Sequence, residues 1–170
     1  TWIDEKRILY DGIVQWGKDY KKHVIGLFSL DLQTNEVKKV YEHKLGELIL
    51  GFDFSPHGNK VVISDSHLWI GALRGDQVVD MAEVGLGHHP RFSPDGKKIA
   101  YSSQYDHEKK KISGSEEIFV MDLETKEVTR LTHNEWRDKD LTWSPDGTKI
   151  LFCSPRLGDP VIGADLYVIN

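Results

Sequence analysis

The stretch "TWSPDGTKILF", residues 142–152, places a four-residue corner between two short apolar runs, and "RFSPDGKKIAY" repeats it at residues 91–101. In "SPDG", serine suits the first position of a type I turn, proline presets the second and glycine tolerates the fourth. The flanking runs are rich in strand-forming residues, so each stretch predicts two antiparallel strands that meet at the corner. A third corner stands at residues 55–58, and "TWIDEKRILY" at residues 1–10 is a fainter relative.

A second element recurs between the corners. "LFSLDLQTNEVKKV" (27–40) matches "IFVMDLETKEVTRL" (118–131) position by position, and weaker versions occupy residues 68–81 and 165–170. Each reads as a strand, a polar turn and a second strand, which gives a repeating unit of four strands, A to D. Four such units in 170 residues have the period of about 40 to 45 residues that propeller blades show. The sequence therefore predicts an all-β fold, a β-propeller of about four blades with four antiparallel strands each.

The predicted blades form a single domain and cover residues 1–45, 46–82, 87–133 and 137–170. Strand A of the first blade is expected to begin at Thr1, and the last blade is expected to lack its outer strand. Because open sheet edges invite pairing with other chains, we expect an incomplete arc of a larger propeller, with remaining blades or another chain at the open edge. A closed ring of four blades is the structural alternative.

Composition limits the classes of partner. The chain is 39% hydrophobic and 29% charged, and 22 basic against 27 acidic residues give a net charge of −5 without a long basic stripe. Nucleic acid is therefore not an expected partner. The apolar runs are too short for membrane insertion, and the first residues lack a secretory-signal pattern, which does not settle the location. The single cysteine, Cys153, cannot form an internal disulfide and is expected in the core.

The segments "FSPDGKKIAY", "EIFVMDLETKEVTRLTHN" and "DLTWSPDGTKILF" together resemble the TolB-type β-propeller repeat. This repeat also occurs in the propeller domains of prolyl oligopeptidase relatives and of oligogalacturonate lyases. The resemblance implies a complete ring of six to eight blades and a periplasmic or extracytoplasmic location, with the cytoplasm left open. The motif is specific for the blade and not for a function, because its recurring residues shape turns and packing.

In a propeller the B-to-C and D-to-A connections lie on one face, and the A-to-B and C-to-D turns lie on the other. The A-to-B corners are uniform here, whereas insertions of roughly ten residues collect in the B-to-C loops at 11–26, 102–117 and 154–165. Insertions on one face commonly mark a binding surface. The candidate contacts in these loops are Trp16, Tyr20, Tyr105, His107 and Arg156. The alternative is that they are solvated loops with incidental aromatic residues.

A second set of candidates lies where the D-to-A connections lead into the innermost strands, at the mouth of the central channel. Alignment of the corners brings His88, His89 and Asp140 to this mouth, with Arg91 opposite Asp53 as a polar pair. Adjacent residues on a strand point to opposite faces, so the two histidines are not expected to share one metal ion. No metal site and no cofactor are predicted.

Two classes of function remain open. The preferred interpretation is a non-catalytic scaffold that binds a protein, peptide or glycan through its B-to-C loops and channel mouth. The alternative is the propeller part of an enzyme, either a polysaccharide lyase with metal-binding channel histidines or the gating domain of a serine peptidase. No Gly-x-Ser-x-Gly elbow and no Gly-rich phosphate loop occurs in the chain, so no catalytic residue is predicted.

Overall fold

The structure is a computed structural model that describes residues 1, 3–15, 24–43, 48–57, 59–106, 111–155 and 165–170. Over these ranges the chain forms thirteen β-strands and no helix, so none of its described segments is a candidate membrane-spanning helix. The strands pair antiparallel throughout. The prediction of an all-β fold is confirmed.

The strands in chain order are β1 (Arg7–Gln15), β2 (Val24–Asp31), β3 (Val37–Glu42), β4 (Gly51–Phe54), β5 (Lys60–Ser64), β6 (Ser66–Arg74), β7 (Gln77–Phe92), β8 (Lys98–Asp106), β9 (Lys111–Asp122), β10 (Val128–Arg130), β11 (Lys139–Trp143), β12 (Ile150–Ser154) and β13 (Asp165–Ile169).

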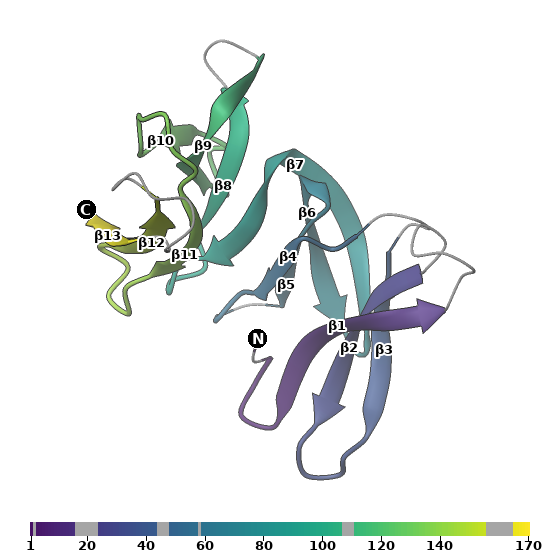
Figure 1. Cartoon of the computed structure of the whole chain (residues 1–170). Helices are drawn as coiled ribbons and strands as arrows, with labels where there is room; N and C mark the ends of the chain where they lie inside the picture. Colours follow the sequence, from purple (N-terminus) through teal and green to yellow (C-terminus); the bar gives the residue numbers. More distant parts are fainter. Residues whose placement is uncertain (2, 16–23, 44–47, 58, 107–110, 156–164) are drawn as a thin grey trace.

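These strands form four blades, which follow one another along an arc (Figure 1). Blade 1 is β1–β2–β3, and blade 4 is β11–β12–β13. Blade 2 is β4–β5–β6 with the first part of β7, and blade 3 is the second part of β7 with β8–β9–β10. The sheets of the described residues do not close into a ring. The described strands therefore form an open arc of a propeller.

Blades 2 and 3 are joined without a loop, because β7 serves both. Its first part pairs with β6 as far as Gly87, and from His88 onward it pairs with β8. The boundaries drawn from the sequence at residues 82 and 87 both fall inside this strand. The D-to-A connection here is thus a continuous strand that passes from the outside of one blade to the inside of the next.

The predicted first strand of blade 1 is described only at Thr1. β1 is the second strand of its blade, and Thr1 exchanges two backbone hydrogen bonds with Leu9 (2.9 and 2.7 Å). Thr1 also donates its hydroxyl to Asp53 of β4 at 3.0 Å, and Figure 1 shows the N-terminus beside blade 2. Thr1 therefore lies at the inner-strand position of blade 1.

The corners have the turn geometry that their sequence predicts. The Gly96 amide donates to the Ser93 carbonyl at 2.8 Å, and the Gly147 amide donates to the Ser144 carbonyl at 2.9 Å. Both glycines are left-handed, with φ of 68° and 69°, a conformation that residues with a side chain adopt at a cost. The glycine at the fourth position is thus required by the backbone.

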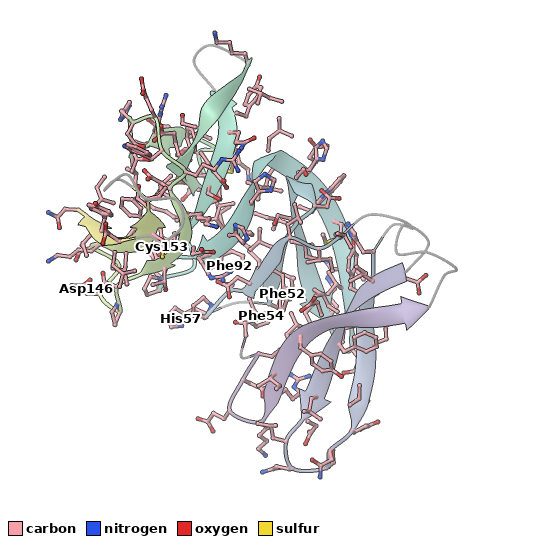
Figure 2. The ribbon with its side chains drawn as sticks, viewed as in Figure 1. Phe52, Phe54, His57, Phe92, Asp146 and Cys153 are labelled. Carbon is pink, nitrogen blue, oxygen red and sulfur yellow. The ribbon has the colours of Figure 1, made fainter. Side chains whose placement is uncertain are left out.

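The core lies between successive blades. In the contacts of blade 2 with blade 3 and of blade 3 with blade 4, the earlier blade contributes small and aliphatic side chains and the later blade contributes aromatic ones. Val62 and Leu68 of blade 2 pack against Tyr101 and Phe119 of blade 3. In the same way Ala100 and Ile118 of blade 3 pack against Ile150 and Phe152 of blade 4. Figure 2 shows Phe52, Phe54 and Phe92 gathered where blades meet. Stability depends on stacking these faces, which a lone blade cannot bury.

Candidate functional site

The innermost strands are linked to one another in chain order around the channel. The Asp53 carboxylate of β4 accepts hydrogen bonds from the Thr1 hydroxyl and, at 2.9 Å, from the Phe92 amide of β7. The Trp143 indole of β11 donates to the Arg91 carbonyl at 3.1 Å. These contacts fix the relative height of the inner strands, so the aligned positions of different blades lie at the same level of the channel.

A β-bulge occurs at the channel mouth in both blade 3 and blade 4. In blade 3, His88 pairs with Ser102 and Arg91 pairs with Ala100, so three steps on β7 face two on β8. The shift on β11 between Lys139 and Thr142 has the same size. A bulge leaves one residue outside the ladder and redirects its side chain, which is why bulges are frequent beside active sites.

The extra residues of the two bulges are the predicted candidates His89 and Asp140, both in the left-handed region at φ 51° and 53°. Blade 2 has no bulge at this level, and the aligned residue there is Gly51. A Cβ atom built on Gly51 would lie 2.9 Å from the Cα atom of His89, so the two inner strands approach closely at this point. Glycine allows this approach because it carries no side chain.

The two histidines at the mouth are half-buried, and their rings lie edge to face with centroids 6.4 Å apart. Strand alternation was expected to send them to opposite faces, and the bulge at His89 removes that separation. The Nδ1 atoms of His88 and His89 are buried and have no hydrogen-bond partner among the described residues. Burial lowers the pKa of His88, an effect that the nearby Glu116 carboxylate partly opposes. The His88 ring is therefore suited to act as a neutral donor and acceptor.

The predicted pair of Arg91 with Asp53 does not form. The Arg91 guanidinium donates instead to the carbonyl of Pro90 at 2.9 Å and to the carbonyl of Phe52 at 3.3 Å. Asp53 is already occupied by the inner-strand contacts described above. Both side chains are thus held by other groups: Arg91 by two backbone carbonyls, and Asp53 by the Thr1 hydroxyl and the Phe92 amide.

The predicted B-to-C surface is only partly described. Trp16, Tyr20, His107 and Arg156 lie outside the described residues. Tyr105 is half-buried in β8, where its amide donates to the Ser103 hydroxyl at 3.0 Å and it pairs across the hairpin with Ile112. The segment 102–117 was expected to be a loop, but β8 and β9 extend into it as a long hairpin. Among the predicted residues, the structure therefore unites His88, His89 and Arg91 on β7 and places Asp140 at the aligned position of β11.

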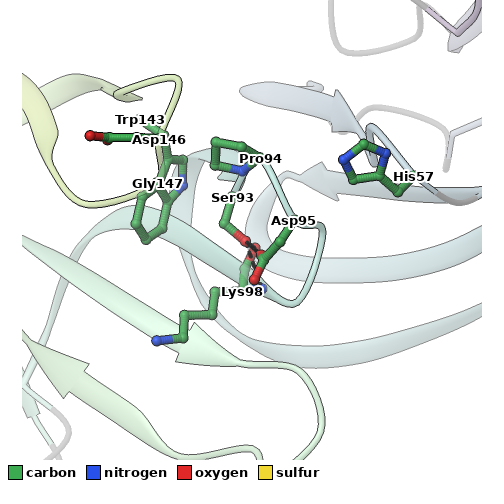
Figure 3. A pocket seen from close by; sticks show the side chains of 8 residues that line it. All are labelled: His57, Ser93, Pro94, Asp95, Lys98, Trp143, Asp146 and Gly147. Atoms are coloured by element: carbon green, nitrogen blue, oxygen red, sulfur yellow. Dashed lines mark hydrogen bonds between the residues drawn. The ribbon is translucent and has the colours of Figure 1, made fainter.

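Sequence reasoning missed a pocket on the opposite face, which it treated as uniform. The corners of blades 2, 3 and 4 converge there around a cavity of about 340 Å³ (Figure 3). Its lining consists of His57, Ser93, Pro94, Asp95, Lys98, Trp143, Asp146 and Gly147. The sequence signal that could have indicated this pocket is Trp143. It directly precedes its corner, whereas phenylalanine precedes the other two corners.

The two carboxylates of this pocket remain charged over the physiological range. Hydrogen bonds from the Ser144 hydroxyl and from Thr148 lower the pKa of Asp146 to about 2, and the Ser93 hydroxyl and the Lys97 amide lower the pKa of Asp95. Because these donors belong to the corners themselves, the carboxylates serve first to hold the turns. Figure 2 shows His57 and Asp146 at the corner ends of their blades.

The comparisons with known proteins agree with this architecture. The profile of the TolB beta propeller domain matches residues 38–168, which is well over half of the chain.

The chain belongs to the TolB β-propeller domain family.

Individual relatives of this family have different roles. The "Uncharacterized peptidase YuxL" of Bacillus subtilis (strain 168) is 38% identical over 82 residues, which are 48% of this chain and 12% of YuxL. The "Tol-Pal system protein TolB" of Desulfotalea psychrophila (strain LSv54 / DSM 12343) is 32% identical over 82 residues, 48% of this chain and 16% of that protein. The chain thus spans only a small part of these relatives.

Solved structures share the fold at low identity. TolB from Acinetobacter baumannii covers 96% of this chain with a TM-score of 0.71 and 22% identity, and the match takes up 38% of that chain. An oligogalacturonate lyase in complex with manganese covers 97% with a TM-score of 0.68 and 20% identity, over 47% of its own chain. The same fold is therefore found both in a TolB protein and in a lyase.

A metal centre does not fit the residues of the mouth as far as they are described. Within the described ranges, no group of three or more His, Cys, Asp or Glu side chains could hold a metal ion. His88 and His89 supply two imidazoles at most. The carboxylate of Glu116, whose charge acts on His88, already accepts a hydrogen bond from the Ser102 hydroxyl at 2.7 Å. The described side chains of this mouth offer hydrogen bonding and charge.

Proposed function

We propose that this TolB-type propeller is a non-catalytic binding module whose channel mouth and B-to-C surface bind a segment of a protein or peptide. Its contacts would be the two imidazoles of His88 and His89, the Arg91 guanidinium and the exposed Asp140 carboxylate.

The observation that carries the proposal is the pair of bulges with left-handed, non-glycine residues at aligned positions of two blades. Such backbone costs about 1–3 kcal/mol for each residue and clusters at sites of function. Blade 2 shows that the fold itself does not need it, since the inner strand there pairs without a shift. Two of the three comparable blades retain this strained backbone, which supports a functional role for the side chains of His89 and Asp140.

The chemistry of the mouth suits a peptide. The buried Nδ1 atoms of His88 and His89 lack partners within the part of the chain that the structure describes, and a peptide backbone offers both donors and acceptors to such atoms. Arg91 and Asp140 provide opposite charges at two levels of the same channel. A glycan offers hydroxyl groups to the same atoms, and the test below separates the two.

The test is a screen of the purified chain on a peptide array and on a glycan array, followed by titration of the best binder. His89→Gly keeps the left-handed backbone and removes the imidazole, so we expect about tenfold weaker binding with unchanged or higher thermal stability. Lys126→Gly is the matched control, because Lys126 is also left-handed, at φ 62°, but lies in a C-to-D turn on the other face. Peptide binding that His89→Gly leaves intact, or binding confined to glycans, contradicts the proposal.

The enzyme alternative is supported by the peptidase name of YuxL and by the lyase among the structural neighbours. It predicts turnover that the binding proposal does not. Formation of unsaturated product from oligogalacturonate in the presence of manganese would favour the lyase, and a peptidase domain encoded beside this segment would favour the gating role.

A further inference from the structure

The cavity of about 340 Å³ on the face opposite the mouth lies among turns that contact one another. The corner of blade 3 rests on that of blade 2, since a Cβ atom on Gly96 would lie 2.7 Å from the Ser55 hydroxyl oxygen. The corner of blade 4 rests on that of blade 3, since a Cβ atom on Gly147 would lie 3.4 Å from the Pro94 Cδ atom. The cavity is therefore walled by three nested turns, which hold its shape.

Trp143 gives this cavity an aromatic wall. Phe54 and Phe92, the aligned residues of blades 2 and 3, are 7% and 5% exposed and belong to the core between blades. Trp143 packs against the core between blades 3 and 4, but its larger ring also reaches the Arg91 carbonyl and lines the cavity beside Pro94 (Figure 3). Because that carbonyl already accepts the indole N–H, the ring is fixed and offers a ligand its flat apolar surface.

The two carboxylates of the cavity each hold their turn with one oxygen. Asp95 accepts the Ser93 hydroxyl and a backbone amide through Oδ1. Asp146 accepts its hydrogen bonds from Ser144 and Thr148 through Oδ1 as well. Neither Oδ2 atom has a hydrogen-bond partner within the described ranges, and both side chains are exposed. Each carboxylate therefore retains one charged acceptor that a ligand can use.

Donors line the same space. The Lys98 ammonium and the His57 ring belong to the lining, so groups of both signs surround the cavity and disfavour a ligand of high net charge. A sugar ring carries hydroxyl groups that both donate and accept, and its C–H groups form an apolar face that packs against an aromatic ring. The volume falls within the range of about 300–1,000 Å³ of small-molecule sites.

We infer that this corner pocket, walled by Trp143, Pro94, Asp95 and Lys98, binds one ring of a neutral glycan. The sugar stacks on the Trp143 indole, one hydroxyl donates to Asp95 Oδ2, and another accepts from Lys98. The bond to the carboxylate contributes most, because hydrogen bonds to a charged acceptor are stronger than those between neutral groups. The inference is independent of the peptide proposed for the channel mouth, since the two sites lie on opposite faces.

The test is titration of the full chain with glucose, galactose, N-acetylglucosamine and their disaccharides, followed by NMR of the tryptophan indole groups. We expect the Trp143 signal to shift with a Kd of about 1 mM, as for other ligands of this size. Trp143→Phe identifies this signal and should weaken binding about threefold or more, because the smaller ring covers less of the sugar. Asp95→Asn retains Oδ1 for the turn and replaces Oδ2 with a donor, so we expect about tenfold weaker binding.

Asp31→Asn is the matched control, because Asp31 also holds a turn through Oδ1 but lies in blade 1, away from the pocket. This variant should bind sugar as the wild type does. The absence of an indole shift with every sugar, at concentrations well above the expected Kd, overturns the inference. It is equally overturned if Asp95→Asn binds as well as Asp31→Asn, or if His89→Gly abolishes sugar binding, because the sugar would then lie in the channel mouth.

Discussion

Blades 3 and 4 begin with nearly the same corner and differ in what surrounds their strands. "FSPDG" and "WSPDG" fold into the same turn, and β8–β9 and β12–β13 pair in the same register. Glu117 and Ile118 of blade 3 are nevertheless buried, whereas the aligned Asp165 and Leu166 of blade 4 are exposed. Local sequence therefore sets the turn and the register, and the neighbouring segments decide how much each position contributes to stability.

The largest expected effect concerns the buried carboxylate of Glu117 in blade 3, compared with the exposed Asp165 at the aligned position of blade 4. The Glu117 carboxylate accepts hydrogen bonds from the Thr132 hydroxyl at 2.6 Å and the Asn134 amide at 3.0 Å, and it pairs with Arg130 at 3.0 Å. Glu117→Ala removes the carboxylate that these three groups share, and we expect a loss of about 3–5 kcal/mol in the free energy of unfolding. Asp165→Ala should stay within about 0.5 kcal/mol. Denaturant unfolding of both variants checks this, and equal losses would show that the segment after β10 does not protect Glu117.

The next effect compares Ile118, which blade 4 covers, with the exposed Leu166 at the aligned position of blade 4. Ile118→Ala creates a cavity between blades 3 and 4 and should cost about 2–5 kcal/mol. Leu166→Ala removes a side chain that is already in solvent and should change stability by about 0.5 kcal/mol or less. Thermal unfolding of dilute protein measures both. A large loss at Leu166 would mean that another segment covers blade 4.

A smaller effect concerns the contact between the two inner strands. Trp143→Phe gives blade 4 the residue that blade 3 carries at this position, Phe92, and removes the hydrogen bond to the Arg91 carbonyl. We expect a loss of about 0.5–1.5 kcal/mol in the free energy of unfolding. If the variant is as stable as wild type, the indole contributes packing only.

The smallest effect separates the two corner carboxylates. Asp146 accepts a hydrogen bond from the Thr148 hydroxyl at 2.8 Å, a donor that Asp95 lacks because lysine occupies the corresponding position. Both folded pKa values lie below the ordinary 3.8, so the stabilisation is present above that pH and is lost as the pH falls toward the folded pKa, about 2 for Asp146. Titration of the carboxyl carbons by NMR should show Thr148→Ala raising the pKa of Asp146 toward that of Asp95. A midpoint at 3.8 or above in wild type contradicts the corner geometry.

The corners and the 91-residue repeat were predictable because their chemistry is local. Asp31 and Asp122 lie at matching positions of the repeat. The Oδ1 atom of each accepts hydrogen bonds from two backbone amides of the following turn, at 2.8 and 2.9 Å for Asp31 and at 2.9 and 3.0 Å for Asp122. Asn35 and Lys126 are both left-handed after them. No local sequence signal distinguishes the continuous β7 from two strands joined by a loop. Its passage from blade 2 to blade 3 is therefore seen only in the structure.

For the candidate site, the sequence predicted which residues lie near one another but not their detailed geometry. Alignment of the corners brought His89 and Asp140 to one level, and the shared bulge agrees with that alignment. The bulge itself, and with it the contact between the rings of His88 and His89, depends on pairing across strands that the sequence does not encode locally. The partners of Arg91 and the network around Glu117 likewise arise from segments that only the tertiary fold brings together.

Thiol accessibility tests the stacking of blades most directly. In a Cys153→Ser background, Ile118→Cys and Leu166→Cys place one thiol at the same register position of a covered and of an open face. In dilute protein, the thiol at 166 should react with a soluble disulfide reagent as fast as in the unfolded chain, and the thiol at 118 only upon unfolding. Equal rates at the two positions, or protection at 166 in the monomer, would contradict an open arc of successively stacked blades.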